Sequence, residues 1–310
     1  MTIDTNSFIR FLDPPASNES LLYIMESRPW LQRVGAIARA CIRLGVDIAN
    51  RSHHYFNFRQ EQSLFLLPVK GEEGWLYPED SLPWSQASQS SGLFLFIHGL
   101  RGSPLSWGGY LRELKAKSPQ AHLLAPHVAE GGNCSLETAA EPFVAVIKNY
   151  LERFPGRPIT LLGTSNGGRI LSYLECRLTS EEIGEGELNI VSIAGVHYGT
   201  KWVEWLENAH MLWTLRFHPA LSEEFRWGGK FAKGLLDKWI DKQAEWEKGG
   251  VKVRHLFCST LEDEQVMDSS SSRPLLKGEC EYRVLEGENH LSIVPAAQQE
   301  VLKWLKRESP

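Results

Sequence analysis

The 310-residue sequence lacks the features of a disulfide-bonded, exported or membrane-spanning protein. Its five cysteines are widely spaced and include no CxxC pair, which argues against a disulfide framework and against structural zinc. No apolar run approaches the roughly 18 residues that a membrane-spanning helix requires. The first residues also lack the basic and apolar regions of a secretory signal. We therefore expect a cytoplasmic protein without an integral membrane segment.

Excess positive charge is also absent. The sequence has 38 Asp and Glu residues against 33 Lys and Arg residues, for a net charge of -5. Binding to phosphate surfaces requires a concentrated excess of Lys and Arg, and no such block occurs. A nucleic-acid partner is therefore not expected, and no internal repeat is visible.

What the sequence does have is a regular alternation of buried-strand and helix patterns. Short apolar runs that end in Gly, Ser or Pro indicate parallel strands covered on both faces, and amphipathic helical segments at 136–154, 166–177 and 293–305 lie between or after them. The strand patterns are at 92–99, 121–126, 158–163, 188–195, 251–259 and 280–287. This order predicts an α/β fold with a mostly parallel open sheet and helices on both faces.

The patterns divide the chain into three parts. Residues 1–60 form an N-terminal helical extension, whose apolar face at 20–50 favours packing on the core over binding to a membrane surface. Residues 61–198 and 251–310, with a further strand pattern at 63–69, form the α/β core. Residues 199–250 form a helical cap between two core strands.

One turn in the core has the pattern of a nucleophile elbow. LGTSNGG (162–168) joins a predicted strand to a predicted helix and places glycines at 163, 167 and 168 around Ser165. A sharp strand-to-helix turn of this kind raises a serine above the sheet, and the helix N-terminus directs N–H groups toward developing negative charge. Ser165 is the candidate nucleophile, and a structural turn serine is the alternative.

A nucleophilic serine needs a base and an orienting acid near the carboxyl edge of the sheet. His290, in EGENHLSIV after the last strand, is the candidate general base. STLEDEQV (259–266) follows the preceding strand, and Asp263 in it is the candidate acid. Glu262 and Asp268 are the alternative acids, and a solvated acidic loop without a catalytic role is the other interpretation.

The early turn HGLRG (98–102) has a different predicted role. A base at His98 would break the order serine, acid, histidine along the chain. We therefore assign this turn a backbone role, in which the N–H groups of Leu100 and Asn166 form the oxyanion hole.

Taken together, these residues resemble the α/β-hydrolase superfamily, and within it lipases and esterases. The matching stretches are FIHGLRG (96–102), APHVAEGGNCS (125–135), GTSNGG (163–168), AGVHYGT (194–200), STLEDEQV (259–266) and GENH (287–290). The resemblance implies a triad of Ser165, Asp263 and His290, an oxyanion hole at Leu100 and Asn166, and no cofactor or metal. The chain departs from the family pattern at Val196, where many lipases have proline, and in the acid loop, which lacks the usual glycine after the aspartate.

The cap segment is rich in aromatic residues. We expect its apolar faces to pack mainly on the core, and their edges to form an acyl pocket above Ser165. The pocket candidates are Met211, Trp213, Phe217 and Trp227, and the pair Gly228-Gly229 is a candidate hinge.

The sequence thus predicts a serine hydrolase that cleaves esters with an apolar acyl or alcohol group and acts on a small-molecule substrate. A thioesterase or an acyltransferase would use the same residues. The alternatives of another class are a hydrolase-like scaffold that binds without turnover and, less favoured, a membrane-attached lipase.

Overall fold

The computed structural model describes residues 84, 87–208 and 217–306. The predicted N-terminal extension and the strand pattern at 63–69 lie outside these residues. The six other strand patterns and the three helical segments lie within them.

The described core is an all-parallel six-stranded sheet with the order β2-β1-β3-β4-β5-β6. All six predicted strands are present, within a few residues of their predicted ends. Their bounds are Leu93–Ile97 (β1), His122–Leu124 (β2), Ile159–Thr164 (β3), Glu187–Ile193 (β4), Lys252–Ser259 (β5) and Glu279–Val284 (β6). Because every strand runs in the same direction, the loops after β1, β3, β4, β5 and β6 share one edge of the sheet.

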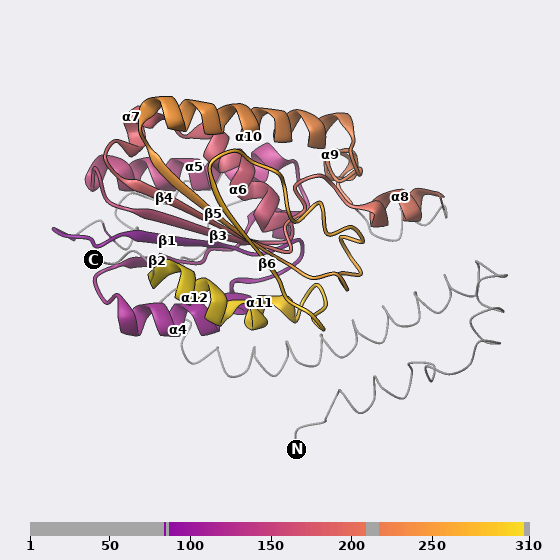
Figure 1. The fold of residues 1–310 in the computed structure, drawn as a ribbon, viewed down its shortest axis with the longest axis horizontal. Coiled ribbons are helices and arrows are strands. Elements are labelled where there is room, and N and C mark those ends of the chain that lie inside the picture. The colour runs from indigo at the N-terminus through magenta and orange to yellow at the C-terminus, as the bar shows by residue number, and fades with distance from the viewer. Residues whose placement is uncertain (1–83, 85–86, 209–216, 307–310) are drawn as a thin grey trace, which may run out of the picture. The chain divides into compact units, whose positions relative to one another are not determined.

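Helices cover both faces of the sheet (Figure 1). One face carries α5 (Leu136–Arg153), α6 (Asn166–Arg177) and α10 (Lys230–Gly249), and the other carries α4 (Gly108–Lys117), α11 (Ile293–Ala296) and α12 (Gln298–Lys306). The shorter elements are η3 (Pro104–Trp107), η4 (Ala129–Gly132), α7 (Ser180–Ile183), α8 (Lys201–Asn208) and α9 (Pro219–Glu224). The predicted α/β sandwich of a parallel sheet between two helical layers is confirmed.

Local sequence signals account for the ends of the longest helices. Ser135 precedes α5, and its hydroxyl accepts a hydrogen bond from the N–H of Thr138, as expected for an N-cap. Gly250 follows α10 in the left-handed conformation, which glycine adopts without the cost that a side chain would impose.

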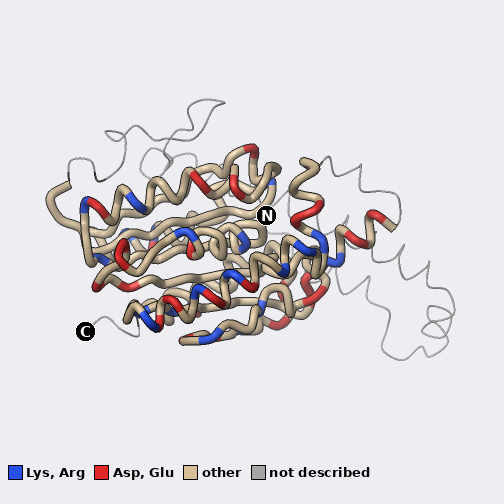
Figure 2. The backbone as a smooth tube through the Cα atoms, turned by 90° about the horizontal axis from the view of Figure 1, so that it is seen from above, with Lys and Arg blue, Asp and Glu red and all other residues tan. Residues whose placement is uncertain are grey.

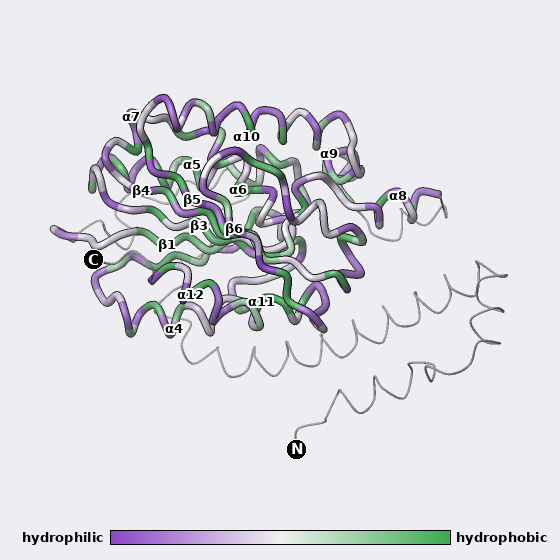
Figure 3. Tube along the Cα trace, viewed as in Figure 1, coloured by the Kyte–Doolittle hydropathy of each residue, from purple (hydrophilic) through white to green (hydrophobic). Residues whose placement is uncertain are grey.

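Neighbouring residues along each strand face opposite helical layers. Leu161 and Ile190 pack with α5 and α6, whereas Leu162 and Val191 pack with α4 and α12. Figure 3 shows the same division, with hydrophobic residues concentrated in the strands and the outer faces of the helices hydrophilic. The continuous apolar runs in the sequence therefore reflect burial on both sides of the sheet.

The most buried charge in this core is the carboxylate of Glu175, on the face of α6 that meets α10 and β5. Three α10 side chains donate to it: Trp239 Nε1 at 2.6 Å, Gln243 Nε2 at 2.8 Å and Trp246 Nε1 at 2.9 Å. His255 Nε2 on β5 lies 2.9 Å from the same carboxylate. Four donors from two elements therefore converge on one buried side chain.

These contacts keep Glu175 ionised although it is fully buried. Burial by itself raises the pKa of the carboxyl, but His255 and the donors on α10 outweigh burial and lower it. Burial likewise opposes the charged form of His255, yet Glu175 and the nearby Cys280 raise the pKa of the imidazole to about 9. A buried charge is tolerated when its hydrogen-bonding capacity is satisfied, and α10 supplies most of that satisfaction.

The segment predicted as a cap contains two kinds of structure. Its long helix α10 packs against α6 in the helical layer over the sheet, through Trp239 and Trp246 among others. Helices α8 and α9 lie between β4 and α10, beyond the carboxyl edge of the sheet (Figure 1). The division of the chain into core and cap stays a prediction, and α8 and α9 are the parts of the segment that lie nearest the loops of that edge.

Residues of both charge signs are interspersed along the described helices (Figure 2). Within residues 84, 87–208 and 217–306, no helix is both long and apolar enough to cross a membrane.

We predict that Glu175→Gln lowers the free energy of unfolding by about 3 kcal/mol or more, because the new amide N–H₂ faces N–H donors and leaves His255 without its carboxylate. For a domain of this size the melting temperature should fall by about 6–12 °C. Thermal unfolding followed by circular dichroism measures this change. Glu247→Gln, which removes an exposed carboxylate of α10, is the matched control and should change stability by less than about 0.5 kcal/mol. Equal effects of the two variants would contradict the assigned role of Glu175.

Candidate active site

Ser165 lies at the turn between β3 and α6 in a strained backbone conformation. Its φ is 55° and its ψ is -121°, a region that non-glycine residues rarely occupy. The carbonyl of Ile193 on β4 holds the Ser165 N–H at 3.0 Å. This is the strand-turn-helix geometry predicted from LGTSNGG.

The glycines around Ser165 allow this turn because a side chain at any of them would collide with neighbouring atoms. A Cβ at Gly163 would lie 2.6 Å from the carbonyl of Gly167, and one at Gly167 would lie 2.3 Å from the carbonyl oxygen of Ile97. A Cβ at Gly168 would lie 2.6 Å from Ser192 Oγ on β4. Gly163 and Gly167 therefore permit the turn itself, and Gly168 permits α6 to pack closely on the sheet.

The turn after β1 packs directly against Ser165. A Cβ at Gly99 would lie 2.9 Å from Ser165 Cβ and 3.4 Å from Ser165 Oγ. His98 connects this turn to the segment after β2. Its Nδ1–H donates to the carbonyl of Gly99 at 2.8 Å, and its Nε2 accepts from the N–H of Val128 at 2.9 Å. His98 is buried and neutral in this arrangement, consistent with a structural role and not that of a base.

Leu100 and Asn166, the two predicted oxyanion donors, flank Ser165. Leu100 follows Gly99 in the packed turn, and Asn166 is the first residue of α6. No acceptor for either N–H is found among the described residues. The amide side chain of Asn166 is held at both ends, because Arg169 Nε donates to its Oδ1 at 3.0 Å and its Nδ2 donates to the carbonyl of Gly132 at 3.1 Å.

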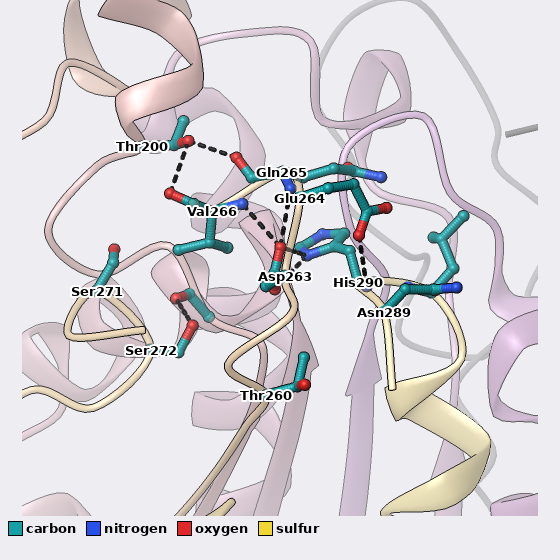
Figure 4. A network of polar contacts seen from close by, with 12 residues as sticks. Thr200, Thr260, Asp263, Glu264, Gln265, Val266, Ser271, Ser272, Asn289 and His290 are labelled. Atoms are coloured by element: carbon teal, nitrogen blue, oxygen red, sulfur yellow. Dashed lines mark hydrogen bonds and ion pairs between the residues drawn. The ribbon is translucent and has the colours of Figure 1, made fainter. Parts of the chain in front are cut away.

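The loops after β5 and β6 bring Asp263 and His290 together (Figure 4). His290 Nδ1 lies 2.8 Å from Asp263 Oδ2 and 3.0 Å from Oδ1. Both side chains are almost fully buried, with exposed fractions of 3% and 4%. This contact therefore lies in a region of low dielectric constant, where a hydrogen bond to a charged carboxylate is strong.

The surroundings of Asp263 keep its carboxylate charged. Burial raises the pKa of Asp263, but His290 and the N–H groups of Val266 and Gln265 outweigh burial and lower the pKa below its ordinary value. Those N–H groups reach Asp263 Oδ1 at 2.8 and 3.0 Å. The carboxylate that would orient the base is consequently ionised at neutral pH.

The other acidic residues of this loop have different surroundings. Glu262 is exposed. Asp268 pairs with Lys201 at 2.5 Å, and hydrogen bonds from Lys201 and Ser270 lower its pKa to about 2. Among the three acids that the sequence left open, the contact with His290 Nδ1 is made by Asp263.

Sequence reasoning missed several residues around these groups. Glu264 Oε2 accepts from the backbone N–H of His290 at 3.4 Å. Arg169 and Glu224 form a buried ion pair at 2.7 Å, and Thr200 contacts the acid loop. Arg169 carried a weak signal, since it is a charged residue among the apolar and small residues at the start of α6, whereas Glu224 and Thr200 had none.

The predicted pocket residues fall into different places. Met211 and Trp213 lie outside the described residues. Phe217 packs in a small apolar cluster of Val203, Leu221 and Phe225, together with Leu100. Trp227 contacts the ring of Tyr198 at 5.3 Å between centroids and the ammonium group of Lys201 at 4.8 Å.

Phe217 therefore shares its cluster with Leu100 of the turn after β1, whereas Trp227 belongs to a separate aromatic group. Within the described residues, no three or more His, Cys, Asp or Glu side chains are grouped as ligands for a metal ion.

Scans against protein-family models and curated protein sequences gave no match. Solved structures do resemble the chain. The lin2722 product of Listeria innocua superimposes with a TM-score of 0.50 at 13% identity, over 72% of this chain and 96% of that one. The lipase BlEst2 of Bacillus licheniformis superimposes with a TM-score of 0.49 at 16% identity, over 70% and 92%.

The phospholipase PlaB of Legionella pneumophila gives a TM-score of 0.42 at 13% identity, over 54% of this chain and 37% of that protein. The chain thus spans well under half the length of PlaB. At these identities the likeness concerns the fold. With its six parallel strands, its strained serine turn after β3 and its helices on both faces of the sheet, the chain has the α/β-hydrolase fold.

Proposed function

We propose that the protein is a serine hydrolase that cleaves carboxylic esters with an apolar acyl or alcohol group. Ser165 is the nucleophile, His290 the general base and Asp263 the orienting acid. The observation that carries the proposal is the buried contact between Asp263 and His290 Nδ1, at the sheet edge where Ser165 occupies its strained turn. The lipases among the structures with the same fold are consistent with this proposal.

The contact with Asp263 selects the tautomer of the base. When Nδ1–H donates to the carboxylate, Nε2 carries the lone pair that accepts a proton. Ser165 Oγ attacks the ester carbonyl as its proton moves to His290 Nε2. The N–H groups of Leu100 and Asn166 stabilise the oxyanion, and the N-terminus of α6 adds its positive dipole end.

His290 then gives the proton to the departing alcohol, which leaves an acyl group on Ser165. Water attacks the acyl-enzyme with His290 again as base, and the acid product leaves. The ionised Asp263 stabilises the imidazolium formed in each half of the reaction. A thiol leaving group or an acceptor alcohol would use the same steps, and the substrate tests below distinguish thioesters from esters.

The apolar cluster beside Leu100 supports the choice of substrate. Phe217, which is partly buried, packs against the buried Val203, Leu221 and Phe225, as does Leu100 of the proposed oxyanion hole. We propose that Phe217, with Met211, Trp213 and Trp227, receives the apolar part of the ester. Burying one methylene group contributes about 0.8 kcal/mol, so a few methylenes suffice for selectivity.

We predict that a fluorophosphonate probe labels the wild-type protein and not Ser165→Ala. Ester hydrolysis by this variant should fall by at least about 10³-fold, because no other group supplies the nucleophile. Gel fluorescence and release of p-nitrophenol measure the two effects. Ser106→Ala, which removes an exposed hydroxyl near the start of α4, should be labelled like the wild type. Labelling of Ser165→Ala at the wild-type rate would refute the assignment.

We predict that Asp263→Asn lowers kcat by about 10⁴-fold with little change in KM, because the amide favours the wrong tautomer of His290. Steady-state kinetics with a p-nitrophenyl ester measures this loss. Glu262→Gln and Asp268→Asn remove the neighbouring carboxylates and should retain kcat within about threefold. A larger loss of kcat in either control than in Asp263→Asn would identify that control residue as the orienting acid.

We predict that kcat/KM rises with acyl chain length from acetate upward in a series of p-nitrophenyl esters. Each buried methylene should contribute up to about fourfold, which corresponds to about 0.8 kcal/mol. Phe217→Ala should reduce the advantage of the longer esters more than it reduces the rate with acetate. A preference of the wild type for acetate over every longer ester would exclude the apolar pocket, and a matched thioester series shows whether thioesters are the better substrates.

A further inference from the structure

Two short segments of the polypeptide meet where α8 begins and α9 ends. The N–H of Thr200 donates to the carbonyl of Phe225 at 2.9 Å, and Thr200 pairs with Arg226 in a single parallel bridge. Gly199 has a φ of +85°, and a Cβ there would lie 2.3 Å from the carbonyl oxygen of Arg226. Only glycine permits this approach. We call residues 199–200 and 224–226 the clasp.

One half of the clasp holds the acid loop. The hydroxyl of Thr200 donates to the carbonyls of Gln265 and Val266, and Figure 4 shows it directed at these two residues. The N–H groups of the same two residues donate to Asp263 Oδ1 at 3.0 and 2.8 Å. Thr200 thus contacts the peptide unit between Gln265 and Val266, whose N–H donates to the carboxylate facing His290.

A second contact strengthens this half. Ser271 Oγ donates to the carbonyl of Gly199 at 2.7 Å and accepts from the N–H of Tyr198 at 3.0 Å. The segment that enters the clasp is therefore bound to the loop between β5 and β6 at two places, 265–266 and 271.

The other half of the clasp holds the nucleophile turn. Glu224 Oε2 binds Arg169 Nη1 at 2.7 Å, and Arg169 Nε donates to Asn166 Oδ1 at 3.0 Å. The ring of Phe225 lies under the guanidinium, 4.7 Å from its carbon to the ring centroid. Asn166 supplies one of the proposed oxyanion donors, and its side chain connects this residue through Arg169 to Glu224 and Phe225.

Burying the ion pair of Arg169 and Glu224 costs free energy, which favours a positioning role for the pair over a stabilising one. The side chains of Arg169 and Glu224 are only 2% and 8% exposed. Burial lowers the pKa of Arg169, and Glu224 opposes that effect. Arg169 Nη2 is buried without a hydrogen-bond partner among the described residues. A buried pair with an unsatisfied N–H contributes little to stability compared with apolar side chains of the same volume.

Glu224 is also fixed from a third side. Both of its carboxylate oxygens accept from the N–H of Leu136, at 3.0 and 3.2 Å. Leu136 is the first residue of α5, where the helix dipole favours negative charge. Movement of this carboxylate would break its hydrogen bonds with both Arg169 and the N-terminus of α5.

We propose that the clasp fixes the position of the acid relative to the oxyanion hole, with Thr200, Arg169 and Glu224 as positioning residues. This proposal rests on the proposed function for its catalytic consequence. Its structural content is a coupling between two sites: a change at Glu224 is transmitted through Phe225 and Thr200 to Asp263 and His290. No contact between Glu224 and the acid loop is needed for this coupling.

Kinetics tests the two halves separately. Thr200→Val removes the hydroxyl at nearly constant volume, and Glu224→Gln removes the charge that holds Arg169. Each should lower kcat and the rate of fluorophosphonate labelling by about tenfold or more, since small displacements of reacting groups are costly, with KM changed less than about threefold. Thr200→Ser keeps the hydroxyl and should restore activity to within about threefold of the wild type.

A neighbouring exposed carboxylate provides the matched control. Glu223 precedes Glu224 in α9, and its exposed carboxylate binds the side chain of Arg226 at 2.9 Å. Glu223→Gln should retain kcat within about twofold. Loss of activity in Glu223→Gln equal to that in Glu224→Gln, or full activity in both Thr200→Val and Glu224→Gln, would overturn the proposal.

The His290 Nδ1–H proton tests the coupling without any need for turnover. Its low-field proton NMR signal reports the contact with Asp263 directly. Glu224→Gln should shift or broaden this signal, and should no longer do so in a Thr200→Val background; the two effects on kcat should likewise be non-additive by about threefold or more. Arg169→Lys, which keeps the positive charge, serves as a second variant if Glu224→Gln fails to fold.

The outcomes separate the two proposals. An unlabelled wild-type protein refutes the hydrolase, and the NMR shift in Glu224→Gln then still decides whether the clasp couples the sites. A labelled wild type whose His290 signal is the same in Glu224→Gln refutes the clasp and leaves the hydrolase standing.

Discussion

The close packing of α6 on the sheet is the constraint on which the rest of this structure depends. It requires that Gly163, Gly167 and Gly168 have no side chains, because a Cβ at each would lie within 2.6 Å of other atoms. The same packing forces Ser165 into its positive-φ turn and directs the N-terminus of α6 toward it. At the other end of α6, Glu175 binds α10 and β5. One helix therefore carries the strained turn at its start and an anchor of the core near its end.

Two buried pairs of carboxylate and histidine have opposite roles in this molecule. Glu175 and His255 lie within the core, surrounded by donors from α10, and they join a helical layer to the sheet. Asp263 and His290 lie in loops at the carboxyl edge, where the acid is held by two backbone N–H groups. The chemistry of the side chains is the same. The two pairs differ in the imidazole nitrogen that faces the carboxylate, Nε2 in His255 and Nδ1 in His290, and in their position relative to the sheet edge.

Much of this arrangement could be predicted from the sequence because it depends on local patterns. The apolar runs predicted all six described strands, and LGTSNGG predicted the turn at Ser165. The order of the loops along a parallel sheet placed Asp263 and His290 at one edge. Asp263 remained one of several candidates, because a run of acidic residues does not indicate which one turns inward.

The residues that sequence reasoning missed have partners that are distant along the chain. Arg169 meets Glu224 55 residues later, and Thr200 meets Val266 66 residues later. Such a contact has no periodicity or spacing that a sequence could display. The helix at 230–249 shows the same limit, because its apolar faces indicated burial without indicating that it covers α6.

By itself, the sequence determined the alternation of strands and helices, the strained serine turn and the order of the candidate catalytic residues, because each follows from the backbone and side-chain preferences of short segments. Tertiary structure alone decided which acid faces His290, which helix shields Glu175 and how Thr200 and Glu224 connect the two halves of the site. Those choices depend on burial and on hydrogen bonds between segments that only the folded chain brings together.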